Sequence, residues 1–95
     1  MPVDDIAADS GPDMAEYHRL MNKANLLYGQ GQAVAQVAGQ LHNRVAEMRA
    51  HWRGKRADRF EEEWNKTNAM LSGWANDLVQ LSEDIKVRAD EILAE

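Results

Sequence analysis

Apolar residues recur every three or four positions through two long stretches of the chain. In the first stretch they are Met14, Tyr17, Met21, Ala24, Tyr28, Gly31, Val34, Ala38, Leu41, Val45, Met48 and Trp52. Residues three and four apart share one side of an α-helix, so this pattern predicts one long amphipathic helix, about residues 13–51. Asp13, followed three residues later by Glu16, is typical of a helix start, and Ser10 could cap the helix one turn earlier.

The second stretch is more regular than the first. Its apolar positions are Ala57, Phe60, Trp64, Thr67, Leu71, Trp74, Leu78, Leu81, Ile85, Ala89 and Ile92. The strict alternation of three and four residues from Ala57 to Ile85 is a heptad repeat, which favours packing along a partner helix. It predicts a second helix, about residues 55–93, and a turn at residues 52–54.

Two long helices joined by a short turn must lie antiparallel, because no other arrangement buries both apolar stripes. The predicted fold is all-α, an antiparallel helical hairpin. A single line of helix contact supplies roughly a few kcal/mol of net stability, so we expect two hairpins to pair into a four-helix bundle dimer. The residues expected in the core and dimer seam are Leu41, Val45, Met48, Phe60, Trp64, Leu71, Trp74, Leu78, Leu81 and Ile85.

Glycines mark the middle of the first helix and the turn. Gly29, Gly31 and Gly39 each cost about 1 kcal/mol relative to alanine in a helix interior, which predicts either a local bend or the close approach of another helix. Gly54 can adopt the left-handed backbone conformation that closes a helix, so we expect it to cap the first helix at its C-terminal end. Trp52, at the last seam position, is expected to pack across both helices at their junction.

Composition argues against several classes of function. The net charge of -5 opposes a nucleic-acid partner. Residues 1–12 are expected to form a flexible acidic tail, and they lack the basic and then apolar character of a cleavable signal peptide. The chain has no cysteine, and His18, His42 and His51 lack the spacing of a helical metal site. We therefore expect no catalytic, cofactor-binding or metal site.

A basic cluster surrounds the turn, formed by Arg49, Arg53, Lys55, Arg56 and Arg59. One interpretation is a docking patch for an acidic partner or for membrane headgroups, of which the membrane is the less favoured. The other is that these cations complement the dipole of the first helix or are simply solvated. Lys55 and Arg56 do not fit the second interpretation, because positive charge is unfavourable at the start of a helix.

The turn also carries a family resemblance. With Trp52 and Gly54 at the centre, Phe60 eight residues beyond Trp52, no cysteine and two helices of matched length, the chain resembles the WXG family of type VII secretion systems. These early-secreted-antigen type proteins have about one hundred residues, so the likeness covers almost the whole chain. If the residue roles of the family apply to this chain, Trp52 and Gly54 would form the motif, and Phe60 and Trp64 would be core aromatics of the second helix.

The resemblance implies a bacterial protein that pairs with itself or with a second WXG-type protein. It also implies secretion from the cytoplasm without a cleavable signal peptide, through the secretion ATPase. The predicted function is therefore a non-enzymatic, dimeric exported substrate or escort of a partner. The alternative is an intracellular coiled-coil adaptor unrelated to secretion.

The chain departs from the family pattern at two places. Thr67 stands where the family often has a second aromatic residue, with Trp64 nearby instead. No tyrosine follows Tyr28, so the Tyr-Xaa-Xaa-Xaa-Asp/Glu export signal of many exported pairs has no match near the end. A partner could carry that signal, the chain could be shortened, or the export machinery does not recognise this member itself.

Overall fold

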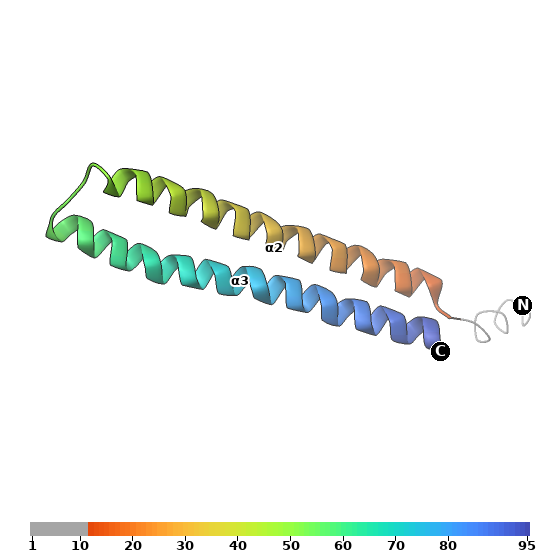
Figure 1. The fold of residues 1–95 in the computed structure, drawn as a ribbon. Coiled ribbons are helices and arrows are strands. Elements are labelled where there is room, and N and C mark those ends of the chain that lie inside the picture. The colour runs from red at the N-terminus through yellow and green to blue at the C-terminus, as the bar shows by residue number, and fades with distance from the viewer. Residues whose placement is uncertain (1–11) are drawn as a thin grey trace, which may run out of the picture.

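The computed structural model describes residues 12–95, which form two helices, α2 (Met14–Arg49) and α3 (Lys55–Ala94). The helices lie side by side along their whole length and run antiparallel, connected at one end by residues 50–54 (Figure 1). The all-α helical hairpin is thereby confirmed. Helix α2 ends two residues before the predicted boundary, and α3 extends one residue beyond it. Of the predicted acidic tail, residues 1–11 lie outside the described part of the chain.

Helix α2 begins directly after Asp13. The Asp13 carboxylate accepts a hydrogen bond from the backbone N–H of Glu16 at 3.0 Å, which satisfies one of the free donors of the first turn. Arg19 donates to the Glu16 carboxylate, with 2.7 Å between Nε and Oε2, and this hydrogen bond lowers the pKa of Glu16. The acidic side chain of the first turn therefore stays charged at the positive end of the helix dipole.

The side chains buried most deeply between the helices are small. They are Ala24, Gly31 and Ala38 on α2, and Ala57, Ala75, Ser82, Ala89 and the larger Ile92 on α3. A seven-residue spacing relates Ala24, Gly31 and Ala38, and it also relates Ala75, Ser82 and Ala89. Because seven residues make almost two turns, each set forms a line along its helix. The two backbones can approach closely where these small-residue lines meet.

Gly31 lies at a point of especially close approach. A Cβ atom at this position would lie 3.0 Å from the Ala75 carbonyl oxygen and 3.0 Å from Cγ2 of Val79. At Gly29 and Gly39 a Cβ atom would meet nothing within 4 Å. Helix α2 continues through all three glycines, so close approach, and not a break, explains Gly31.

The hairpin is a thin rod. Its principal extents are 76 × 17 × 15 Å and its radius of gyration is 22.0 Å, whereas a compact chain of this length would have about 12 Å. Within residues 12–95, the largest side chain that is less than 2% exposed is that of Ser82. Neither helix carries an apolar stretch long enough to cross a membrane. A single hairpin thus places few large apolar side chains out of contact with water.

Substituting two glycines of α2 tests the close approach. We expect Gly39→Ala to raise the free energy of unfolding by up to about 1 kcal/mol, because the helix gains propensity in open space. Gly31→Ala should lower it by about 1 to 3 kcal/mol, because the added methyl group presses against the Ala75 backbone. Urea unfolding at one protein concentration measures both variants. Equal stabilisation by the two substitutions would contradict the tight contact at Gly31.

Candidate functional site

The corner between the helices is built around Trp52, Phe60 and Arg49. The half-buried Trp52 ring packs against Phe60 with 5.5 Å between ring centroids. Arg49, at the end of α2, donates hydrogen bonds to the Trp52 carbonyl oxygen at 2.7 Å, to Asp58 at 2.6 Å and to Glu61 at 3.1 Å. Its side chain is 20% exposed. Arg49 therefore ties the end of α2 to the first two turns of α3.

Gly54 occupies the N-cap position of α3, with φ 112° and ψ 178°. Helix α2 has already ended at Arg49, where Ala50 is still in the right-handed helical region. The prediction that Gly54 caps the first helix is therefore wrong, because the chain needs its unusual backbone conformation just before α3 and not just after α2. Residues other than glycine are almost never found in this φ/ψ region. The Gly54 carbonyl oxygen accepts the first hydrogen bond of α3, from Asp58 N at 2.9 Å.

The predicted seam residues occupy two kinds of position. Half-buried beside the neighbouring helix are Val45, Trp64, Leu71, Leu78 and Ile85, while Leu41, Met48, Phe60, Trp74 and Leu81 are exposed. The division on α3 follows from helix geometry, since Trp74 and Leu81 immediately precede the buried Ala75 and Ser82 and point about 100° away from them. The small-residue line of α3 faces α2. The row of larger side chains beside it, which includes Trp74 and Leu81, stays exposed.

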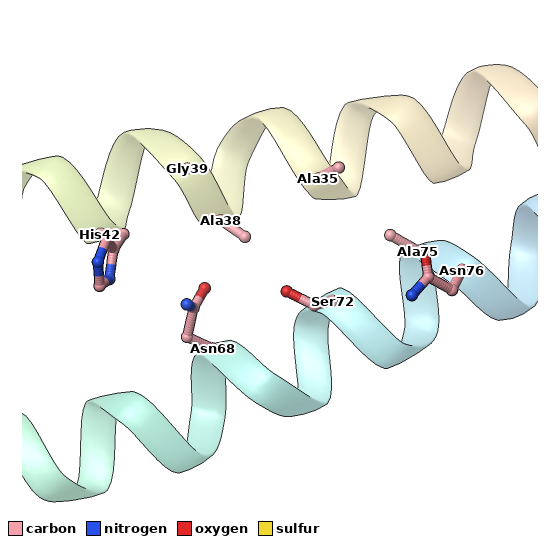
Figure 2. Close-up of a pocket in the computed structure, with 8 residues that line it drawn as sticks. All are labelled: Ala35, Ala38, Gly39, His42, Asn68, Ser72, Ala75 and Asn76. Carbon is pink, nitrogen blue, oxygen red and sulfur yellow. The ribbon is translucent and has the colours of Figure 1, made fainter.

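One side of the hairpin is a shallow groove of about 300 Å³ between the two helices. In Figure 2, His42 and Ala38 of α2 face Asn68 and Ser72 of α3 across this groove. The lining is small or polar, and consists of Ala35, Ala38, Gly39, His42, Asn68, Ser72, Ala75 and Asn76. We call this side the grooved face. Our sequence reasoning did not single out Asn68, Ser72 or Asn76, which lie four residues apart and so share one side of α3.

His42 lies at one end of the groove and contacts Trp64 of α3. The Trp64 indole N–H donates to Nδ1 of His42 at 3.1 Å, and the two rings stack with 6.4 Å between centroids. Accepting this bond requires Nδ1 of His42 to be unprotonated. The imidazole is thus engaged in joining α2 to α3.

The opposite side of the hairpin carries a long apolar row on each helix. The rows are Leu20, Leu27, Val34, Leu41 and Met48 on α2, and Phe60, Thr67, Trp74 and Leu81 on α3. On each helix the apolar row lies next to the small-residue line, on the side away from the groove. The rows of α2 and α3 therefore lie on the same side of the hairpin. We call this side the apolar face. Large exposed apolar patches are uncommon on monomeric proteins and mark interaction sites.

Trp74 lies at the middle of the apolar face. Its side chain is 54% exposed, and the neighbouring Met70 is 55% exposed. The contacts of Arg49 with Asp58 and of His42 with Trp64 fix the register of the two helices. In this register Trp74 lies about level with Val34. A large aromatic ring at the centre of an uncovered apolar surface is typical of an interface hot spot.

The basic side chains near the turn separate into two groups. Arg49 is held in the corner, whereas Arg53, Lys55, Arg56 and Arg59 are exposed. None of these four forms an ion pair with any residue in the range 12–95. We call these four residues the basic tip, and they remain candidates for the predicted docking patch.

A family model described as "Proteins of 100 residues with WXG" matches residues 14–94, which include the turn and both helices. The chain belongs to the WXG100 family. Membership associates the protein with bacterial type VII secretion, through which proteins of this family are secreted. WXG100 proteins typically form homodimers or heterodimers and are not known as enzymes. Neither a curated protein nor a solved structure matches the chain significantly.

The backbone requirement at Gly54 predicts the effect of substituting it. We expect Gly54→Ala to lower the free energy of unfolding by about 1 to 3 kcal/mol through backbone strain. Since a Cβ atom at Gly54 would meet nothing within 4 Å, a steric clash would not explain the loss. Arg53→Ala is the matched control in the same turn, and thermal unfolding compares the two. A Gly54→Ala variant as stable as Arg53→Ala would contradict a glycine-specific conformation.

Proposed function

We propose that this WXG100 protein is a non-enzymatic, dimeric substrate or escort in a type VII secretion system. It leaves the cytoplasm through the secretion ATPase without a cleaved signal peptide. Its partner is a second copy or another WXG-type protein. The main support is the uncovered apolar face along a hairpin whose most deeply buried residues are mostly alanine, glycine and serine.

Energetics support an obligatory partner. Fully burying a large apolar side chain contributes about 1.5 to 3 kcal/mol, and the exposed Leu41, Trp74 and Leu81 forgo much of this in the single hairpin. A second helical hairpin laid on the apolar face would cover both rows and complete a four-helix bundle. Folding and pairing are therefore coupled, and the stability of the protein depends on the concentration of its partner.

The grooved face supports a binding role more than a chemical one. Alanine, glycine, serine and asparagine line most of the groove, and its titratable side chain, His42, is engaged by Trp64. The family match over residues 14–94 favours secretion over the alternative of an unrelated intracellular adaptor. Together these observations support a protein that acts through its surfaces.

Deleting the secretion ATPase in the source bacterium tests the route of export. We expect the protein to disappear from the culture medium and to remain detectable inside the cells. A protein exported with a cleaved signal peptide serves as the unaffected control, and a cytoplasmic enzyme reports cell lysis. Unchanged amounts in the medium of the deletion strain would refute the proposed route.

Two matched leucine substitutions test whether export requires the apolar face. Leu81 lies on that face, while Leu26 is 62% exposed and points about 200° away from the buried Ala24. We expect Leu81→Asp to abolish secretion, because a carboxylate buried without a partner costs several kcal/mol. Leu26→Asp should be secreted like the wild type. Normal secretion of the Leu81→Asp variant would show that the apolar face is not needed.

A further inference from the structure

We propose that the basic tip, formed by Arg53, Lys55, Arg56 and Arg59, is a docking surface for an acidic segment of another protein. This contact goes beyond the proposed function, because it does not involve the apolar face. Three observations support it. The tip cations lack carboxylate partners, they stand where positive charge destabilises a helix, and Lys55 and Arg59 point away from the hairpin.

The acidic residues closest in sequence to the basic tip are already engaged. Arg49 binds Asp58 at 2.6 Å and Glu61 at 3.1 Å, and the Arg49 side chain is 20% exposed. Three exposed cations elsewhere on the rod each pair with a glutamate three residues away, namely Arg19, Lys66 and Arg88. The basic tip forms no ion pair with any residue from 12 to 95, so its four charges are available to a partner.

The position of the cluster on α3 is unfavourable for the stability of the hairpin. Lys55 and Arg56 occupy the first turn of α3, where the positive end of the helix dipole repels cations. Lys55 and Arg59 lie four residues apart, a spacing at which like charges on a helix repel each other. The cluster therefore does not serve the folding of α3, and attraction to an external acidic group accounts for it better.

Lys55 and Arg59 point outward from the hairpin. Each lies two residues from Ala57, which is fully buried between the helices, so each side chain points about 160° away from that contact. Both residues lie at the end of the rod that carries the turn (Figure 1). A partner that covers the apolar face therefore leaves these two cations accessible.

The surroundings of the basic tip favour a short acidic segment over an extended anionic surface. Glu62 and Glu63 are exposed and lie three and four residues after Arg59, on the same side of α3. A membrane or a nucleic acid carries many negative charges, which would also meet these two carboxylates and a chain of net charge -5. A segment with a few carboxylates can contact the tip alone. Arginine, which supplies three of the four tip residues, can donate two parallel hydrogen bonds to one carboxylate.

Binding of an acidic peptide tests the docking surface. The protein is titrated into fluorescein-labelled hexaglutamate at low ionic strength, and fluorescence anisotropy gives the dissociation constant. We expect binding that weakens as salt is added, and no binding of labelled hexaglutamine. The tip variant, Lys55→Gln with Arg59→Gln, should raise the dissociation constant at least about 5-fold, because two cations that contact the peptide are lost.

A second double variant controls for net charge. Lys23→Gln with Arg44→Gln removes two exposed cations of α2 that also form no ion pair within residues 12–95. This variant has the same net charge as the tip variant but keeps the basic tip, so we expect wild-type affinity for hexaglutamate. Circular dichroism shows whether both variants are folded. Thermal unfolding should give the tip variant a higher Tm than the wild type, because charge repulsion at the start of α3 is relieved.

Several results would overturn the inference. Absence of hexaglutamate binding by the wild type, or equal affinity of the two double variants, would show that the tip is not a docking surface. A lower Tm of the tip variant would show that Lys55 and Arg59 serve the fold. Tighter binding to phosphatidylglycerol vesicles than to hexaglutamate, lost in the tip variant, would assign the tip to a membrane. None of these results depends on export or on the apolar face, so the proposed function is tested separately.

Discussion

The close approach of α2 and α3 along two lines of small residues is the constraint on which the remaining structure depends. A methyl group at Gly31 would lie 3.0 Å from the Ala75 carbonyl oxygen and from Cγ2 of Val79, so these neighbours would have to shift to admit it. Large side chains therefore cannot occupy the central line of contact and lie beside it. Leu41, Trp74 and Leu81 lie exposed on the side away from the groove, which gives that side of the hairpin its apolar rows. The proposed need for a partner rests on this exposed apolar surface.

The corner at Trp52 and Gly54 sets the register in which the small residues meet. Gly54 supplies a backbone conformation that other residues avoid, and Arg49 joins α2 to Asp58 and Glu61 on α3. A shift of α3 by one residue would rotate its contact side by about 100° and place a larger row against α2. Trp52 and Gly54, the family motif, thus affect the structure far from the turn. By setting the register, they determine which side of α3 faces away from α2.

Periodicity alone predicted the two helices, the turn and the all-α hairpin. It did not predict which row of α3 faces α2, because a hydrophobic pattern ranks Trp74 and Leu81 above Ala75 and Ser82, whereas close packing selects for small size. The seven-residue repeats of small residues around Gly31 and Ser82 are the signal that could have identified the contact. The role of Gly54 as the N-cap of α3 was missed, because a glycine between two helices can end the first helix or begin the second.

The same geometry determines which surfaces remain outside once the apolar face is covered. The grooved face and the apolar face lie on opposite sides of the hairpin, so a partner on one leaves the other open. The asparagine and serine side chains of the grooved face retain hydrogen-bonding capacity. Small neighbours such as Ala35 and Gly39 leave these side chains accessible. A partner on the apolar face would thus leave the groove, lined by small and polar side chains, in contact with water. A protein that must stay in solution on its way to another compartment requires such a surface.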